Sequence, residues 1–186
     1  MLQKIESQLL TLHKEKFDIN KKILNVIRDV EKQISDSNKL KILFTEPREA
    51  IFVDADKVRI YQVISNLLHN AIKFTKEGTI LVSVRMTQKK GENKEEEEKE
   101  EGREYDSSRR QVIVSVKDSG AGIDPEILPR LFTKFATKSH KGTGLGLFIS
   151  KSIIECHDGS IWGENNPDGK GAMFAFSLPL STDQLP

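Results

Sequence analysis

The sequence of 186 residues contains only one cysteine, Cys156. An internal disulfide and a cysteine-based zinc site are therefore excluded, and a reduced thiol in the cytosol is the ordinary interpretation. Long apolar runs are also missing, since no stretch approaches the roughly 18 residues that span a membrane, and the N-terminus does not look like a signal peptide. We expect a cytoplasmic domain; if its parent protein is a membrane protein, the membrane part lies outside this sequence.

The sequence has almost no excess of charge, because 29 Lys and Arg residues face 28 Asp and Glu residues, for a net charge of +1. This balance gives no argument for binding nucleic acid or a membrane surface. A P-loop lysine motif, a nucleophile elbow and internal repeats are absent as well. What is present, 37% hydrophobic and 31% charged residues, is typical of a globular domain with a well-solvated surface.

Two glycine-rich turns stand out. Residues 118–122 read Asp-Ser-Gly-Ala-Gly, and residues 142–147 read Gly-Thr-Gly-Leu-Gly-Leu and lead directly into a segment with helical spacing. A glycine turn before a helix lets backbone N–H groups approach an anion closely, so polyphosphate is the expected ligand. Between the turns, residues 133–143 have little to anchor them, as expected of a lid over phosphates. The whole stretch between the two turns carries Phe132, Lys134, Phe135, Lys138, His140 and Lys141.

The N-terminal residues predict helices. Leu2, Ile5, Leu9 and Leu12 form an amphipathic stripe that is too short to be stable alone, so it either packs on a partner or ends a longer helix. Lys14–Phe17 is expected to be a polar connection, followed by a second helix that Asp18 caps and that ends near residues 36–38. We expect residues 1–36 to form a helical segment and residues 37–186 to form a separate domain.

Alternating patterns in that domain predict strands and turns. Strands are expected at 40–44 and 50–53, around Ile80–Val84 and Val112–Val116, and at 160–164 and 172–178. Helices are expected from Asp54 or Asp56 to about Phe74, from Asp124 to about Phe132 with Pro125 in its first turn, and up to about Glu155. Trp162 is expected in the core. Residues 88–110 lack apolar periodicity and should form a mobile charged loop, although binding of a partner there stays open.

The helix before Phe74 carries the most informative polar residues. Asn66, Asn70 and Lys73 share one stripe, separate from the apolar stripe of Ile60, Ile64, Leu67 and Ala71. Such a face can simply be solvated. Asparagine is nevertheless a poor residue for an exposed helix surface, whereas amide oxygens and an ammonium suit a hard cation and phosphate.

Asp118 follows Val112, Val114 and Val116 on the same face of its strand. A carboxylate at the end of a buried face needs a partner, and an exocyclic amine of a base is one candidate. The alternative is an Asp-Ser-Gly turn residue that bonds its own backbone. The alternation favours the pocket.

These motifs resemble those of sensor histidine kinases. Residues 66–75, Asn-Leu-Leu-His-Asn-Ala-Ile-Lys-Phe-Thr, resemble the asparagine box, and residues 118–123 resemble the first glycine box. Residues 131–135 are similar to the phenylalanine box and residues 142–147 to the second glycine box. The four motifs occur in the family's order over residues 37–180. The resemblance implies an α+β fold in two layers, a mixed, mostly antiparallel sheet covered on one face by helices, shared with type II topoisomerases, mismatch-repair ATPases and a heat-shock chaperone.

The resemblance also implies the ligands and the roles of site residues. ATP and Mg²⁺ are the implied cofactors, with Asn70 on the metal, Asn66 beside it and Lys73 at the phosphates as the catalytic set. Asp118 would accept from the adenine amine, and residues 124–143 would form the ATP lid. Cofactor binding is implied for Asp118, Gly120, Gly122, Ile123, Phe135, Lys141, Gly142, Thr143, Gly144, Leu145, Gly146 and Leu147.

Two departures from the family pattern shape the expected function. Ala172 follows Gly171 where the family often has threonine, and none of His13, His69, His140 and His157 lies in a phosphoacceptor motif. The chain thus resembles a catalytic half that phosphorylates a histidine on a separate dimerisation domain. The phosphoryl group would then pass to a response regulator receiver domain, and the full-length protein would be a homodimer. An ATP-hydrolysing clamp and a non-catalytic interaction module are the competing interpretations. The clamp relatives carry a glutamate base where Asn66 stands, and an amide cannot take a proton from water.

Overall fold

The computed structural model describes residues 11–34, 39–88, 110–137 and 143–181. Its main sheet has five strands in the order β2-β4-β5-β7-β6. β2 (Leu40–Thr45) pairs parallel with β4 (Gly78–Gln88), and all other neighbours are antiparallel. The other strands are β5 (Arg110–Asp118), β6 (Ser160–Asn165) and β7 (Ala172–Pro179).

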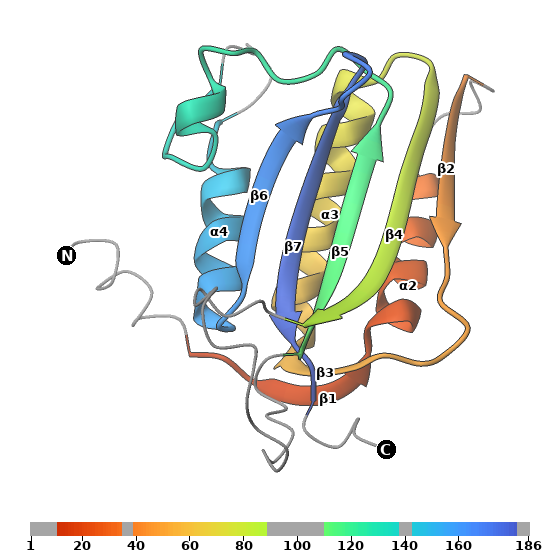
Figure 1. Cartoon of the computed structure of the whole chain (residues 1–186), viewed down its shortest axis with the longest axis vertical. Coiled ribbons are helices and arrows are strands. Elements are labelled where there is room, and N and C mark those ends of the chain that lie inside the picture. The colour runs from red at the N-terminus through yellow and green to blue at the C-terminus, as the bar shows by residue number, and fades with distance from the viewer. Residues whose placement is uncertain (1–10, 35–38, 89–109, 138–142, 182–186) are drawn as a thin grey trace, which may run out of the picture.

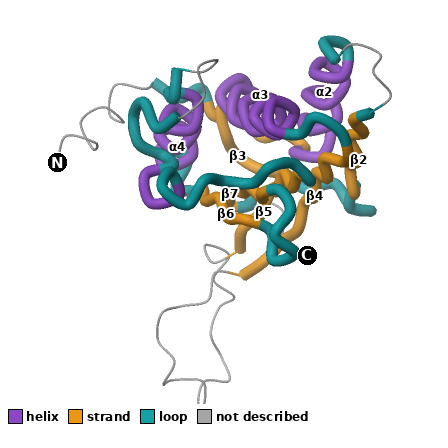
Figure 2. The backbone as a smooth tube through the Cα atoms, turned by 90° about the horizontal axis from the view of Figure 1, so that it is seen from above, coloured by secondary structure: helices purple, strands orange, loops and turns teal. Residues whose placement is uncertain are grey.

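In the described part of the chain, three helices cover one face of this sheet and lie side by side in Figure 2. They are α2 (Ile19–Glu31), α3 (Lys57–Phe74) and α4 (Gly146–Cys156). The expected two-layer α+β fold with a mixed, mostly antiparallel sheet is confirmed. Within the described ranges, no helix is long and apolar enough to cross a membrane.

The core lies between the helices and the sheet because one face of each element is apolar. Val82, Val114 and Phe176 on the sheet are fully buried, as are Ile64 and Leu67 on α3. Val112, Val114, Val116 and Asp118 all point to this covered face, as the alternation predicts, and each is at most 4% exposed. The alternation of side chains along β5 therefore places the Asp118 carboxyl on the face of the sheet that the helices cover.

Local capping fixes where α2 and α3 begin. Asp18 accepts from Asn20 N at 3.0 Å, and Asp56 accepts from Val58 N and Arg59 N at 3.1 and 3.0 Å. Of the two caps considered for α3, Asp56 is therefore the one used. α2 ends at Glu31, earlier than expected, and turns follow it.

The connection expected at Lys14–Phe17 is wrong. These residues belong to β1 (Lys14–Asp18), which pairs antiparallel with β3 (Phe52–Asp56) in a separate two-stranded sheet at the lower edge of Figure 1. Only Phe17 of the four is buried, so the local sequence carries no alternating pattern and pairing with β3 makes the strand.

Two further expectations differ from the structure. The helix expected from Asp124 is a turn followed by the short 3₁₀ helix η2 (Leu128–Arg130). Pro129 inside it lacks the N–H that a longer α-helix would need. Trp162 is only half-buried, because Ile161 takes the core-facing position of β6 and the next side chain points to the other face.

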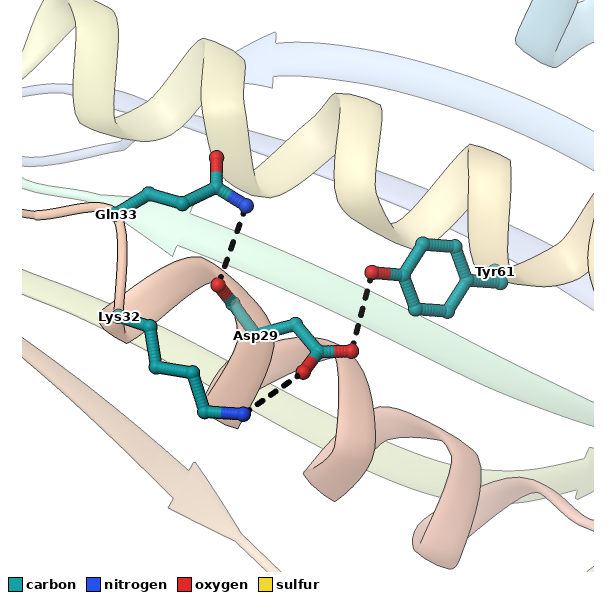
Figure 3. A network of polar contacts seen from close by, with 4 residues as sticks. All are labelled: Asp29, Lys32, Gln33 and Tyr61. Atoms are coloured by element: carbon teal, nitrogen blue, oxygen red, sulfur yellow. Dashed lines mark hydrogen bonds and ion pairs between the residues drawn. The ribbon is translucent and has the colours of Figure 1, made fainter.

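α2 and α3 are also joined by polar contacts (Figure 3). The Tyr61 hydroxyl donates to Asp29 Oδ2 at 3.3 Å, and Lys32 Nζ lies 3.3 Å from Asp29 Oδ1. Burial, and then the Asp29 carboxylate, raise the pKa of Tyr61. Gln33 Nε2 donates to the Asp29 carbonyl at 3.2 Å, which sets the orientation of the Gln33 amide. α2 therefore packs on α3 through the common hydrophobic core and through the hydrogen bond between Asp29 and Tyr61. The functional division of the chain at residue 36 stays a prediction.

Candidate functional site

A pocket of about 770 Å³ lies between α3, the end of β5 and the start of α4. Asn66, Asn70 and Lys73 line it together, so the polar stripe of α3 faces a cavity rather than open solvent. Asp118 lines the same pocket from the sheet. The structure thus brings the two halves of the expected site into one cavity.

Asn66 links α3 to α4. Its Nδ2 donates to the buried Ser150 Oγ at 3.0 Å, and a side-chain carbon at Gly146 would overlap Asn66 Oδ1. Glycine at 146 therefore leaves room for the Asn66 amide where the second glycine turn meets α3. Because the amide is already a donor to Ser150 and has no basic atom, Asn66 cannot act as a general base.

Asp118 satisfies both interpretations of its sequence context. Its Oδ1 accepts from Gly120 N at 2.9 Å, as a turn residue does, and from Ala172 N at 3.3 Å. Within the described residues, Oδ2 makes no hydrogen bond, and the side chain lines the pocket. One carboxylate oxygen is therefore fixed by backbone amides while the other remains available to a ligand.

The first glycine turn contributes unequally to the pocket. Gly122, with φ of +78°, and Ile123 line the cavity, but Gly120 does not. A carbon at Gly120 would overlap the Phe74 carbonyl, so this glycine allows the turn to pack on the end of α3. Ala172, which replaces the family's threonine, also lines the pocket and offers its backbone N–H to Asp118.

The second glycine turn supplies Thr143, Gly144, Gly146 and Leu147 to the pocket lining. Leu145, the N-cap position of α4, is not among the lining residues. Phe135 is not either: its side chain is 70% exposed, and only its backbone meets the turn, donating to Gly144 O at 3.1 Å. Lys141 and Gly142, with Lys138 and His140, lie outside the described residues, as does nearly all of the loop expected at 88–110. Leu2, Ile5 and Leu9 of the expected N-terminal helix lie outside them too. Leu12, the last residue of that stripe, is described and is not helical.

Sequence reasoning missed several residues at the pocket. His69 lines it, with Nδ1 2.7 Å from the Ser65 carbonyl and Nε2 3.2 Å from Gln33 Oε1 on the segment after α2. The sequence did hold a signal for His69, because it lies two residues after Leu67 of the apolar stripe and directly before Asn70. Ser150 and the asparagines of the β6–β7 hairpin carried no signal, because their contacts are long-range.

A magnesium ion fits the donor set only if the nucleotide brings most of its ligands. Asn70 lines the pocket and its amide makes no hydrogen bond to any described residue. No group of three or more His, Cys, Asp or Glu residues in the described ranges could hold a metal. One amide oxygen in a pocket that a glycine turn also lines suits Mg²⁺, which is usually held by one or two protein ligands, substrate phosphates and water.

Comparison with known proteins agrees with this geometry. A family model described as "Histidine kinase-, DNA gyrase B-, and HSP90-like ATPase" matches residues 55–182, and the chain belongs to this family of ATPases. Hybrid signal transduction histidine kinase B of Dictyostelium discoideum is 33% identical over 183 residues, which cover 95% of this chain and 8% of that protein.

Two solved structures are similar as well. The catalytic domain of histidine kinase ThkA is 32% identical with a TM-score of 0.67, over 90% of this chain and 95% of that one. Full-length ShkA in complex with AMPPNP is 25% identical with a TM-score of 0.68, over 93% of this chain and 32% of that one. The chain therefore corresponds to the ATP-binding catalytic domain of histidine kinases. It spans 8, 25 and 36% of the length of three curated relatives, all named as histidine kinases or two-component proteins.

Proposed function

We propose that the chain binds Mg²⁺-ATP and transfers its γ-phosphoryl group to a histidine on a dimerisation domain outside this sequence. The observation that carries the proposal is the shared pocket, in which Asn70 and Lys73 lie on one wall and Asp118 on another. Amide, ammonium and glycine-turn donors suit phosphates, whereas a buried carboxylate oxygen suits the amine of a base. The complex of a similar protein with AMPPNP, an analogue of ATP, is consistent with this assignment.

Transfer of this kind needs positioning and neutralisation of charge rather than a strong base. The bond between the γ-phosphorus and the β–γ bridging oxygen breaks, a phosphorus–nitrogen bond forms at the acceptor imidazole, and ADP leaves. Bound Mg²⁺ would neutralise charge on the phosphates, with Asn70 as its protein ligand. Lys73 adds an ammonium on the same wall, and the N-terminus of α4 presents backbone donors. Catalytic roles for Asn66, Asn70 and Lys73 and cofactor roles for the turn residues are part of this proposal.

The partners follow from the same proposal. The chain would act with a histidine-bearing dimerisation domain, pass phosphate to a response regulator receiver domain, and belong to a homodimer in the cytoplasm. Hydrolysis of ATP as a clamp is disfavoured because Asn66 cannot activate water. A purely non-catalytic module is disfavoured because Asn70, Asp118 and both glycine turns are in place.

Nucleotide binding measured by calorimetry tests the proposal. The chain should bind ATP more tightly with Mg²⁺ than with EDTA, and adenosine should bind independently of Mg²⁺. Equal ATP affinity in the two buffers would remove the metal from the proposal. No detectable binding of ATP or adenosine would overturn the assignment of the pocket and favour a non-catalytic interaction module.

A further inference from the structure

The turn between Asp118 and Asp124 lies at the base-binding end of the pocket but has few backbone contacts of its own. Among the described residues, one backbone–backbone hydrogen bond holds its interior, from Ala121 N to Phe74 O at 3.3 Å. Ser119 Oγ and Asp118 Oδ1 accept two further N–H groups, from Thr79 and Gly120. A turn so loosely paired keeps its shape only if side chains from elsewhere hold it.

Two consecutive asparagines at the end of β6 hold this turn at its two ends. Asn165 uses both atoms of its amide on Ile123: Oδ1 accepts from Ile123 N at 2.6 Å and Nδ2 donates to Ile123 O at 2.9 Å. Asn166 Nδ2 donates to Asp118 O at 2.8 Å and to Lys170 O at 2.6 Å. The β6–β7 turn and the end of β5 meet at the upper edge of the sheet in Figure 1.

The two contacts differ in burial, which separates their roles. Asn166 is 4% exposed and also binds its own hairpin, so it belongs to the core of that turn. Asn165 is exposed, and within the described part of the chain its side chain makes hydrogen bonds only to Ile123. A side-chain carbon at Gly122 would lie 2.8 Å from Asn165 Oδ1, so the amide also packs closely against the pocket-lining Gly122.

We propose that Asn165 is a positioning residue for base recognition, which holds Ile123 and Gly122 in the conformation that forms the adenine end of the pocket. The proposal rests on the proposed function, because it concerns the same nucleotide site. It predicts that Asn165 acts on the base and not on the phosphates, since Ile123 and Gly122 belong to the turn that follows Asp118. It also predicts little effect on global stability, since the side chain is exposed.

Calorimetry with ATP, adenosine and tripolyphosphate tests this role. Asn165→Ala should weaken ATP and adenosine by the same factor, about three- to tenfold for two exposed hydrogen bonds, and leave tripolyphosphate unchanged. Asn165→Asp conserves shape but places a carboxylate oxygen against the Ile123 carbonyl, so it should weaken both ligands at least as much. Glu164→Ala, at the neighbouring exposed position, is the matched control and should change nothing.

Hydrogen exchange of the unliganded protein gives a readout that does not require binding. The Ile123 amide should exchange faster in Asn165→Ala and at the wild-type rate in Glu164→Ala. Wild-type adenosine affinity in both Asn165 variants, or an equal loss for tripolyphosphate, would overturn the proposal. An unchanged exchange rate at Ile123 would also overturn it, even if the wild type bound no ATP and the proposed function failed separately.

Discussion

At the scale of single residues, Asp118 shows how one side chain serves both the fold and the site. Its Oδ1 is held by Gly120 N and Ala172 N, and its Oδ2 is the oxygen available in the pocket. Strand alternation was enough to predict that Asp118 reaches the buried face. Which oxygen is held by the backbone and which is left for the pocket was not predictable, because Ala172 lies 54 positions later in the chain.

Asp118→Asn should therefore separate binding from folding. The asparagine oxygen can keep both backbone bonds, while the amide NH₂ presents a donor to the base amine in place of an acceptor. ATP affinity should fall by about ten- to a hundredfold, the effect of losing a charge-assisted bond of about 1.5–3 kcal/mol. Calorimetry measures the loss, and thermal unfolding should show nearly wild-type stability. Unchanged ATP affinity would exclude Asp118 from the site.

Asn70→Ala should act at the other wall of the same pocket. Because the Asn70 amide makes no hydrogen bond within the described residues, its removal costs the fold little. We expect the Mg²⁺-dependent gain in ATP affinity to disappear while adenosine binding stays close to wild type. Titrations with and without EDTA distinguish the two effects. If adenosine weakened as much as ATP, Asn70 would be a structural residue and the metal assignment would fail.

At the scale of elements, side-chain hydrogen bonds join α3 and α4 at two places. Near the pocket, Asn66 donates to Ser150, and at the far end His157 joins the end of α4 to the start of α3. His157 is 2% exposed; its Nδ1 donates to Ile153 O at 2.8 Å and its Nε2 accepts from Asp56 N at 2.9 Å. The ring must therefore be neutral, with its proton on Nδ1.

This junction makes stability depend on pH. Burial lowers the pKa of His157 below 6.5, even though the hydrogen bond to Ile153 O opposes the shift. The charged groups around the ring are Lys14, Asp56 and Asp158, and Lys14 lies 3.8 Å from Asp158. The unfolded chain binds the proton more readily than the native one. The stabilisation is thus complete above pH 6.5 and is lost as pH falls from there through the lowered pKa.

Thermal unfolding at about pH 7.5 and about pH 5.5 tests this junction. The wild type should melt at a lower temperature at the lower pH, and His157→Gln, which accepts from Asp56 N without titrating, should lose most of that difference. Asp56 does not interfere. Burial raises its pKa, but hydrogen bonds from His13, Arg59 and Val58 outweigh this effect and keep the pKa below 3.8. Its own contribution is lost only in more acidic solution. An equal pH dependence in His157→Gln would show that other groups cause it.

Periodic elements were predictable from the sequence, and elements defined by distant contacts were not. α3 was expected from Asp54 or Asp56 to about Phe74, because its apolar stripe and its candidate caps are local signals. β1 was missed because only Phe17 is buried in Lys14–Phe17, and its strand conformation comes from pairing with β3. The polar face of α3 could be read from spacing, but its contact with Ser150 and Gln33 depends on how α2 and α4 pack beside it.

At the scale of the whole molecule, the N-terminal segment is tied to the helix that carries the site. His13 N donates to Asp56 Oδ2 at 3.0 Å, and β1 then pairs along β3 directly before α3. α2 continues from β1, and Gln33 behind it contacts His69 at the pocket. The N-terminal segment therefore contacts α3 at two places, at its N-cap Asp56 and at His69 in its C-terminal half.

The last prediction concerns what this molecule does by itself. None of its four histidines lies in a phosphoacceptor motif, and Asn66 cannot activate water. We expect the chain to bind Mg²⁺-ATP, to turn it over very slowly and not to label itself with phosphate. A separate dimerisation domain with its acceptor histidine should be labelled in trans. That transfer should be weak, because no covalent link raises the effective concentration of the acceptor.

Incubation with radiolabelled ATP, followed by separation of the two proteins, measures this transfer. Labelling should require the acceptor histidine on the added domain and should disappear with Asn70→Ala in the present chain. Glu164→Ala, outside the pocket lining, is the matched control and should label like wild type. Acid-labile phosphate on the chain alone would mean that one of His13, His69, His140 or His157 accepts phosphate. A catalytic half with an external acceptor should not label itself, because it carries no phosphoacceptor motif. It should also hydrolyse ATP slowly, because Asn66 supplies no base that could activate water.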